Sequence, residues 1–261
     1  MKVATWNVNS IRSRLQIVTD WLQQHRVDVL CLQETKVQDH DFPRSPLEEL
    51  SYSVYISGQK SYNGVALLSL KPLEDVSHGF SPIIGAAEVG SFDDQKRVIS
   101  GIADGVRIVN LYVPNGSAIA SEKYEYKLSW LKLLQTYLQS LQQQPAEICV
   151  CGDFNIALEN KDIYTNKARD KHIMSSPVER EALSQILELG FQDAFRKFSD
   201  EPGQFSWWDY RSGGFSRNRG WRIDHHYLTD KLYQQATSCW IDVEPRKLEK
   251  PSDHAPVVVE F

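Results

Sequence analysis

The stretch ICVCGDFN, residues 148–155, joins four apolar residues to a glycine and two polar residues, Asp153 and Asn155. The apolar part has the continuous hydrophobic character of a strand that is buried on both faces. The two polar side chains therefore stand where this strand ends. A polar residue at such a position is either a turn residue or part of a site at the edge of a sheet.

Similar apolar stretches recur along the chain. We expect further strands at residues 3–6, 27–32, 65–70, 98–102, 106–113, 223–228 and 257–259. Helical spacing of apolar residues predicts amphipathic helices over 11–22 and 130–141. Ser176-Pro177-Val178-Glu179 supplies the N-cap, proline and capping-box glutamate of another helix, which Gly190 closes. Several successive strands have no helix between them, which favours a layered α/β sandwich with mixed sheets over a purely parallel one.

Length and composition set limits on the class of protein. A chain of 261 residues fits one large α/β domain, and we expect a single domain over residues 1–261. The net charge of −5 weighs against a nucleic-acid partner, because phosphate contacts need Lys and Arg. A local basic patch can nevertheless act inside an acidic protein.

The chain start and the cysteines indicate where the protein works. The start lacks the pattern of a signal peptide, and no apolar run approaches the ~20 residues of a membrane span. The four cysteines lack the spacing of a zinc site or of a secreted disulfide framework. We therefore expect reduced thiols in the core, no membrane association and a cytoplasmic location.

Polar residues lie at the ends of several expected strands. Those that follow a strand or end it are Asn7, Glu34, Tyr112, Asp153 and Asn155, and those that precede one are Asp224, Asp253 and His254. If the strands expected at residues 223–228 and 257–259 run antiparallel to the others, all of these groups meet at one edge of the sheets. Taken singly, each has a plainer explanation as a turn residue, a solvated corner or a structural hydrogen-bonding group.

A pocket lined by carboxylates, amides and one histidine suits the hydrolysis of a phosphate ester. Glu34, with Asn7 or Asp253, offers hard oxygen ligands, too few for an all-protein cage. Mg²⁺ suits such a set, because it keeps several waters and also binds substrate phosphate oxygens. The ion would stabilise the charge that builds on the phosphoryl and leaving oxygens.

The other polar groups suit proton transfer and phosphate binding. Asp153 can orient or deprotonate an attacking water, and Asn155 can donate to the phosphate. His254 can also donate to a phosphate oxygen while Asp224 fixes its tautomer. Because no serine or cysteine stands in a recognisable nucleophile motif, direct attack by water is favoured over a covalent intermediate.

Six segments now carry a family resemblance: DVLCLQETK, NGVALLS, LYVPNG, CGDFNIA, GWRIDHHYLT and PSDHAPV. They resemble the motifs of the exonuclease III family of apurinic/apyrimidinic (AP) endonucleases, within the wider endonuclease/exonuclease/phosphatase superfamily. The resemblance runs in register over residues 3–259. GDFN and SDHAP mark the superfamily, whereas QETK and WRID point to its DNA-repair branch.

The resemblance implies a four-layer α/β sandwich, with two mixed β-sheets packed together and flanked by helices. It implies Mg²⁺ or Mn²⁺ dependence, cleavage of DNA 5′ to an abasic site, 3′-to-5′ exonuclease activity and trimming of blocked 3′ ends. The partner would be double-stranded DNA with such lesions, and we expect a monomer. The general base, the number of metals and the balance between endonuclease and exonuclease activity stay open.

The resemblance also assigns roles to individual residues. For the metal it indicates Asn7, Glu34 and Asp253, with Asp153, Asn155 and His254 as further candidates. For catalysis it indicates Tyr112 and Asn155 on the phosphate, Asp153 on the water, and Asp224 with His254 as an orienting pair. Asn9 departs from the pattern, because some relatives carry an aspartate there and use it at the metal. We therefore expect weaker or differently hydrated metal binding.

The segment FSWWDYRSGGFSRNRGWRID, residues 205–224, holds a local basic patch. Between residues 210 and 223 it has no acid and four arginines that we expect to bind DNA, Arg211, Arg217, Arg219 and Arg222. Aromatic residues interleave with them, as in nucleic-acid interfaces, although a charge-rich loop can also be only a solvated face. In the family, residues at the positions of Trp207, Trp221 and Ile223 line the pocket for the abasic sugar.

Two other interpretations keep the same fold. One is a superfamily phosphatase or ribonuclease with the same catalytic core, which the arginine-rich loop and the QETK motif disfavour. The other is a non-catalytic binding module on this fold. That interpretation predicts the loss of a key acid, yet Glu34, Asp153, Asp224, Asp253 and His254 are all present.

Overall fold

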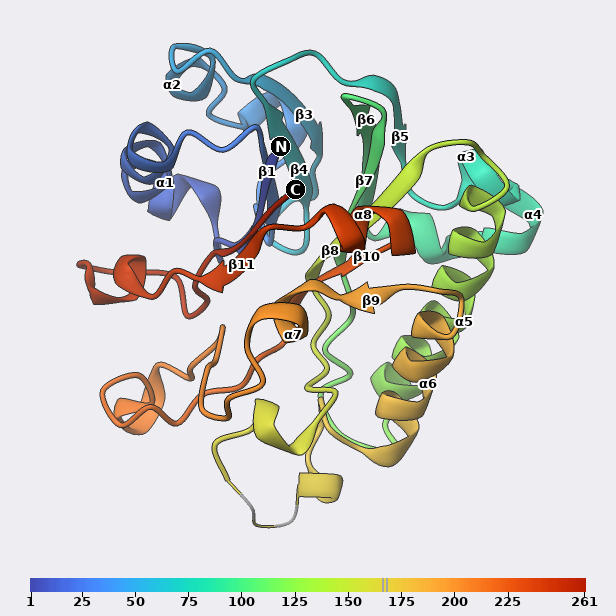
Figure 1. Ribbon diagram of the computed structural model, residues 1–261, viewed down its shortest axis with the longest axis vertical. Coiled ribbons are helices and arrows are strands. Elements are labelled where there is room, and N and C mark those ends of the chain that lie inside the picture. The colour runs from blue at the N-terminus through green and yellow to red at the C-terminus, as the bar shows by residue number, and fades with distance from the viewer. Residues whose placement is uncertain (166, 168) are drawn as a thin grey trace.

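The computed structural model describes residues 1–165, 167 and 169–261 (Figure 1). One sheet contains β1 (Lys2–Asn7), β2 (Val29–Gln33), β3 (Ser53–Ser57), β4 (Val65–Ser69), β11 (Ser238–Ile241) and β12 (Val257–Glu260). The other contains β5 (Glu74–His78), β6 (Val98–Ala103), β7 (Val106–Tyr112), β8 (Glu147–Asp153), β9 (Gln192–Asp193) and β10 (Asp224–Leu228). Their orders are β11-β12-β1-β2-β4-β3 and β5-β6-β7-β8-β10-β9.

Each sheet has one parallel pair of strands at its centre. The pair β1 and β2 is joined by α1 (Ile11–His25), and the pair β7 and β8 by α5 (Glu122–Leu141). The neighbouring strands β12 and β10 run antiparallel to β1 and β8, which is the condition for the polar groups to meet at one edge. Asp224, at the start of β10, therefore lies opposite Asp153, at the end of β8. This topology brings the carboxyl ends of the parallel strands and the amino ends of β10 and β12 to one edge.

Helices cover the outer face of each sheet, so the expected four-layer sandwich is confirmed. Helix α1 and the short α2 (Ser45–Glu48) lie beside the first sheet, and α5 and α6 (Pro177–Leu187) beside the second (Figure 1). The remaining short helices are α3 (Ser81–Ile84), α4 (Ala86–Val89), α7 (Ala194–Phe198) and α8 (Asp230–Gln235). None of the described helices is long and apolar enough to cross a bilayer.

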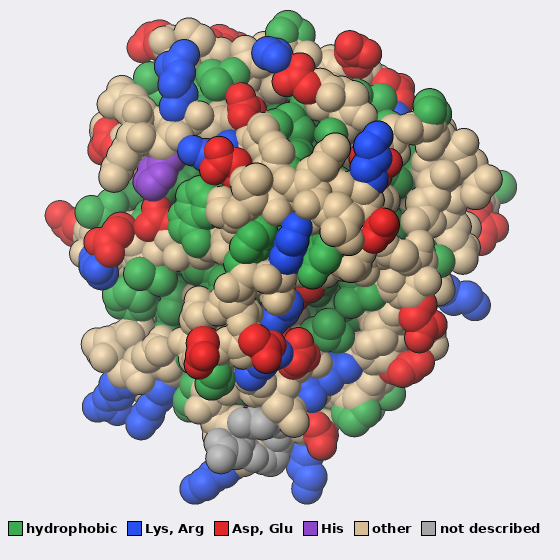
Figure 2. Space-filling view, in the orientation of Figure 1, with side chains coloured by type: hydrophobic (Ala, Val, Ile, Leu, Met, Phe, Trp, Pro, Cys, Tyr) green, Lys and Arg blue, Asp and Glu red, His purple; other side chains and the backbone are tan. Residues whose placement is uncertain are grey.

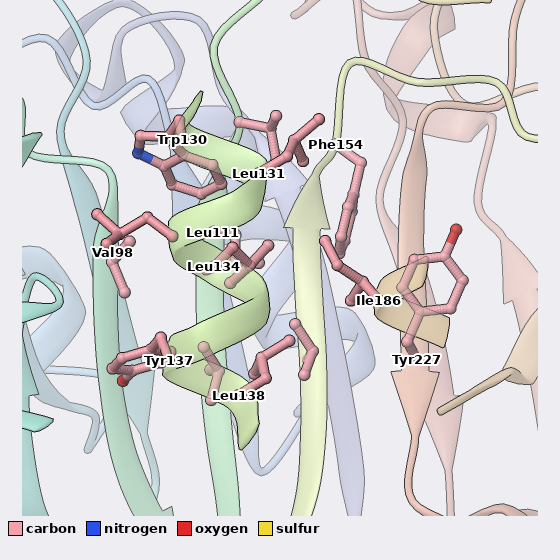
Figure 3. Packing of buried hydrophobic residues seen from close by; sticks show 14 of the residues in the cluster. Val98, Leu111, Trp130, Leu131, Leu134, Tyr137, Leu138, Phe154, Ile186 and Tyr227 are labelled. Carbon is pink, nitrogen blue, oxygen red and sulfur yellow. The ribbon is translucent and has the colours of Figure 1, made fainter. Parts of the chain in front are cut away.

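The core has three main apolar layers. One of them lies between α5 and the second sheet and holds the helix in place. Trp130, Leu134 and Leu138 of α5 are fully buried and face Val98 and Leu111 of β6 and β7 (Figure 3). Burying each such side chain contributes roughly 1.5–3 kcal/mol. A second layer lies between the sheets and includes the four cysteines, which are free and buried as expected.

Helix α6 begins as the sequence predicts. The Ser176 hydroxyl accepts from the backbone N–H of Glu179, and the Glu179 carboxylate accepts from the backbone N–H of Ser176. The helix ends at Leu187, and Gly190 follows with a φ of +100° while its N–H donates to the Leu187 carbonyl at 2.9 Å. Gly190 thus closes the turn that ends the helix, because this backbone conformation favours glycine.

Candidate active site

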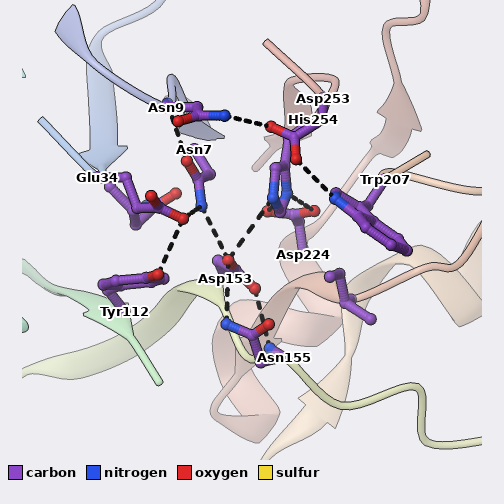
Figure 4. A network of polar contacts seen from close by, with 12 residues as sticks. Asn7, Asn9, Glu34, Tyr112, Asp153, Asn155, Trp207, Asp224, Asp253 and His254 are labelled. Carbon is purple, nitrogen blue, oxygen red and sulfur yellow. Dashed lines mark hydrogen bonds and ion pairs between the residues drawn. The ribbon is translucent and has the colours of Figure 1, made fainter. Parts of the chain in front are cut away.

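A network of polar side chains joins the two sheets at the edge where the parallel strands end (Figure 4). Asn7 ends β1, and its amide donates to Glu34 Oε1 at 3.0 Å and to Asp153 Oδ2 at 2.9 Å. Glu34 follows β2, and the Tyr112 hydroxyl at the end of β7 donates to the same Oε1 at 2.8 Å. Four residues from four strands therefore share one hydrogen-bonded cluster.

Asp153 lies at the centre of this network and is 1% exposed. Its Oδ1 accepts from the backbone N–H of Asn155 at 2.9 Å, and its Oδ2 accepts from the Asn155 amide at 3.2 Å. Gly152 before it has a φ of +146°, and a Cβ there would lie 2.0 Å from the Leu111 carbonyl oxygen. Only glycine allows β8 to approach β7 closely enough to deliver Asp153.

His254 and Asp224 form the expected pair. The Nδ1 of His254 lies 2.9 Å from Asp224 Oδ2, so Nδ1 carries a proton and Nε2 faces Asp153 at 3.8 Å. The Ser206 hydroxyl donates to Asp224 Oδ2 at 2.6 Å and accepts from the backbone N–H groups of Ile223 and Asp224. This contact fixes Asp224 behind the imidazole and thereby fixes the direction of Nε2.

Asp253 stands at the other side of the imidazole. Its Oδ1 accepts from the Asn9 amide at 3.0 Å, and its Oδ2 accepts from the Trp207 indole N–H at 3.0 Å. Lys36 lies 2.8 Å from Glu34 Oε2 and donates to Asn9 Oδ1 at 2.6 Å. Asn9 therefore links Asp253 to Lys36 and Glu34.

The charges in this network shift each other's ionisation. Burial and Asp224 raise the pKa of Asp153 to about 7, although His254 acts in the opposite direction. Burial opposes a charged imidazole, but Asp224 and Asp153 outweigh it and raise the pKa of His254 to about 10. Burial also opposes the Glu34 charge, yet Lys36 holds the pKa of this carboxyl below its usual range. The cluster thus holds more carboxylates than cations.

The donor set fits a hard divalent cation. The oxygen donors along this edge belong to Asn7, Glu34, Asp153 and Asp253. Asp153, Asp224 and His254 also place ligand atoms within 4.8 Å of one another. Oxygen-rich sets of this kind suit Mg²⁺ or Mn²⁺. Burial makes the negative charge of Asp153 unfavourable and so raises its pKa. A cation bound here would stabilise that charge.

A surface hollow of about 470 Å³ is lined in part by Trp207, whose indole N–H donates to Asp253. Its lining includes Tyr164, Thr165, His172, Trp207, Asp209, Arg211, Ser212, Gly214, Arg219 and Trp221. Trp207 and Trp221 line the hollow, whereas Ile223 is buried and packs in the same apolar cluster as both. His172 contributes a further wall, with its ring edge-on to Trp221 at 6.1 Å.

Three of the four predicted DNA-binding arginines are exposed. Arg211, Arg217 and Arg219 lie on the loop at the lower left of Figure 1, where Figure 2 shows Lys and Arg side chains gathered on the surface. The prediction that Arg222 binds DNA is wrong. Its guanidinium is 1% exposed and is held by Asp162 at 2.7 Å and by Asp193 at 2.8 Å.

The Arg222 cluster makes stability depend on pH through His225. Arg222 Nη1 donates to His225 Nδ1 at 3.0 Å, and His225 Nε2 donates to the Ile156 carbonyl at 2.9 Å, so the ring is neutral. Burial and Arg222 lower the pKa of His225 to about 4, against the opposing charges of Asp193 and Asp162. Between about pH 6.5 and pH 4 the unfolded chain takes up a proton that the folded chain rejects, so acidification destabilises the fold.

When the pH falls from about 7 to about 5, we expect the free energy of unfolding to decrease more in the unmodified chain than in His225→Gln. The expected difference between the two decreases is about 2 kcal/mol. Glutamine keeps an acceptor for Arg222 and a donor for Ile156 but does not titrate. Urea unfolding at both pH values measures the difference. An identical pH dependence in the two proteins would contradict the neutral, buried imidazole.

Comparisons with known proteins agree with this geometry. A family model, the endonuclease/exonuclease/phosphatase family, matches residues 4–254. The chain belongs to this family. It is 34% identical over 273 residues to exodeoxyribonuclease III of Haemophilus influenzae, with full coverage of both chains. The expected exonuclease III resemblance is therefore confirmed.

Solved structures of the family share the whole fold. An AP endonuclease from Archaeoglobus fulgidus is 41% identical with a TM-score of 0.92, and the match covers 100% of this chain and 99% of that one. The 3′ phosphatase NExo from Neisseria, bound to a product DNA hairpin, is 37% identical with a TM-score of 0.95 and the same coverage. The chain is accordingly a nuclease of this family, as predicted.

Several residues of the site escaped sequence reasoning. Lys36 belongs to the QETK motif, Asn115 to LYVPNG and Ser206 to the arginine-rich segment. The sequence analysis assigned none of these three residues a role. Asn115 donates to Asn155 Oδ1 at 2.9 Å. His172 carries no motif that would have singled it out, and only the fold places it against Trp221.

Proposed function

We propose that the protein is a Mg²⁺-dependent DNA-repair phosphodiesterase. It cleaves double-stranded DNA 5′ to abasic sites and trims blocked 3′ ends. The observation that carries this proposal is the single network in which Asn7 links Glu34 to Asp153 while His254 Nε2 faces Asp153. The relatives support the substrate class, since they include an AP endonuclease and a 3′ phosphatase bound to DNA.

The residues of the network divide the chemistry among them. Asp153 receives the proton of the attacking water, because its carboxylate lies at the centre of the network and faces His254 Nε2. His254 Nε2, held by Asp224, donates to a phosphate oxygen and offsets the charge that grows there. Asn155 and Tyr112 supply further donors to the phosphate once the substrate displaces their present partners.

The metal would be held by Glu34 and Asp253, with Asn7 as a neutral oxygen ligand. When bound, it supplies Lewis-acid stabilisation of the phosphoryl and leaving oxygens. Lys36 and Asn9 orient the two carboxylates through the contacts that they make with Glu34 and Asp253. An amide at position 9 contributes less charge than a carboxylate, so affinity for the cation depends more on Glu34.

The hollow beside the network selects the lesion. Trp207 and Trp221 present apolar walls at its rim, and Ile223 fills the space behind them. Such walls favour an extruded sugar without a base over an intact nucleotide. Extrusion also costs less at an abasic site, because pairing and stacking are already lost there.

Cleavage assays on defined substrates test the proposal. A labelled duplex with one abasic site should give a nick on its 5′ side, and a duplex with a 3′-phosphate should lose that phosphate, both only with Mg²⁺. A superfamily phosphatase would instead hydrolyse inositol phosphates, and a ribonuclease would cut RNA. Turnover of those substrates with no cleavage of either duplex would overturn the assignment.

Arg217 and Arg219 are expected to bind DNA phosphates, because both are exposed on the arginine-rich loop. Replacing both by alanine should weaken duplex binding and lower the slope of log affinity against log salt by about 1.8, at roughly 0.9 per lost contact. Titrations at several salt concentrations measure this slope.

Lys71 gives a matched control for charge. It lies just beyond β4, at the opposite edge of the sheet, and pairs with Asp104. Lys71→Ala should leave the salt slope unchanged. An unchanged slope in the double arginine variant would remove both arginines from the phosphate contacts.

A further inference from the structure

A buried lysine lies directly beneath the active-site loops, and the mechanism above does not use it. Lys127 of α5 is 0% exposed. Its ammonium donates to Glu179 Oε1 at 2.5 Å, to the Asn155 carbonyl at 2.8 Å and to the Asn115 carbonyl at 3.3 Å. An ammonium has three N–H donors, so each of them has a partner.

Packing alone does not call for a charge at this position. Leu131 and Leu134, which lie one turn and two turns from Lys127 on α5, are buried in the apolar core. A hydrophobic residue would suit that helix face. Removing two charges from water costs several kcal/mol per ion, and such pairs often stabilise a fold no better than apolar residues do. What the ammonium contacts is therefore the better guide to its role.

Its contacts hold the backbone of Asn155, whose amide contacts Asp153, and of Asn115, whose amide contacts Asn155. Asn155 has a φ of +49°, a left-handed conformation that is uncommon outside glycine. Its side-chain amide donates to Asp153 Oδ2 at 3.2 Å and to the Val113 carbonyl at 3.0 Å, and its Oδ1 accepts from the Asn115 amide at 2.9 Å. The peptide carbonyls of both asparagines point to Lys127, so one cation fixes the backbone from which both amides project.

Glu179 anchors the other side of the ammonium. It belongs to the first turn of α6, and its carboxylate also accepts from the backbone N–H groups of Met174 and Ser176 and from the Ser176 hydroxyl. The carboxylate is 0% exposed and cannot move without losing these bonds. The chain from α6 to Lys127 and on to the asparagine carbonyls is therefore rigid.

We propose that Lys127 is a positioning residue, which holds the Asn115 and Asn155 amides in the geometry that aligns the phosphate with Asp153. This role rests on the proposed function. A displacement of about 1 Å in such groups can cost about 100-fold in rate. The contribution acts on the transition state, so it appears in kcat and not in DNA affinity.

Two variants separate the carbonyl contacts from the ion pair. In Glu179→Gln, the glutamine oxygen at the Oε1 position still accepts from the Lys127 ammonium and from the Met174 N–H, so the ion pair is lost while both carbonyls keep their donor. In Lys127→Met with Glu179→Gln, the carbonyls lose their donor and no charge is left unpaired. We expect kcat on the abasic duplex to fall about 10- to 100-fold in the double variant, with KM and Kd within about threefold. Glu179→Gln should lose distinctly less.

Leu138→Ala on the same helix controls for stability. It leaves a cavity in the core and costs about 2–5 kcal/mol without touching the loops. Its kcat should match that of the unmodified enzyme. Equal kcat losses in Leu138→Ala and the double variant, or full activity in the double variant, would overturn the proposal. If the methionine variant does not fold, Lys127→Gln with Glu179→Gln, in which the shorter glutamine keeps an NH₂ group but no charge, should show an intermediate loss.

A second measurement does not depend on activity. Hydrogen exchange of the Asn115 and Asn155 side-chain amides, followed by NMR, should accelerate in the double variant and not in Leu138→Ala. Unchanged exchange would overturn the positioning role. If the unmodified enzyme cleaves no DNA substrate, the proposed function fails, and this exchange experiment still decides whether Lys127 orders the two amides.

Discussion

Replacing Asp153 with asparagine should lower kcat on an abasic duplex by about 10³-fold while DNA affinity changes by less than about threefold. The carboxylate accepts from Asn7 and from both N–H groups of Asn155, and no base of similar strength lies at the same point. An asparagine keeps the shape but turns an NH₂ group toward one of these donors. The water then lacks its base, and nearby amides must move.

Single-turnover cleavage with saturating metal measures the rate, and equilibrium binding in EDTA measures the affinity. Asp104→Asn provides the control, since that carboxylate is exposed beside Lys71 at the far edge. It should change neither quantity. Equal losses of rate and binding in Asp153→Asn would instead assign Asp153 to substrate binding.

The site could be predicted from sequence because it follows from strand order. Once an apolar run is read as a buried strand, the residue after it must lie at the sheet edge, and Asp153 and Glu34 were found in this way. Asp224, Asp253 and His254 reach the same edge because β10 and β12 run antiparallel to β8 and β1. The result is a network across both sheets, in which Asn7 of one sheet contacts Asp153 of the other.

Two of the strands that sequence reasoning missed have little apolar content. Strand β5, EDVSH, is mostly exposed at the end of its sheet, and β9 contains only two residues. Their pairing with a neighbouring strand defines them, and no alternation marks them in the sequence. Residues 53–57 have an alternating pattern, yet they were not singled out.

Arg222 shows a different limit. It shares its segment with exposed arginines, and nothing in the segment itself distinguishes it from them. What buries its guanidinium is Asp162 and Asp193, which are distant in sequence and come together only in the fold. Lys127 is a similar case, because its partners Glu179 and Asn155 lie on other elements. A charged residue in a sequence is therefore expected to be exposed, but this expectation fails where the fold brings a partner of opposite charge to it.

Chelation of the divalent cation should lower the cleavage rate by at least about 10³-fold. The bound ion would stabilise the charge that develops in the transition state, by several kcal/mol. Asp153 and Asp224 lie against His254, Asp253 also acts on its charge, and Lys36 pairs with Glu34. Without a cation, a phosphate approaching this edge meets carboxylates. Adding Mg²⁺ after EDTA should restore the full rate.

Glu34→Gln separates metal binding from the other roles of the network. The amide still accepts from Tyr112, but it has lost the charge that attracts the cation. The Mg²⁺ concentration for half-maximal rate should therefore rise about tenfold or more, while Lys71→Ala should leave it unchanged. Undiminished cutting in EDTA would remove the metal from the mechanism. The control is Asp153→Asn purified in the same way, which must show no such cutting. A contaminating nuclease would act equally in both preparations.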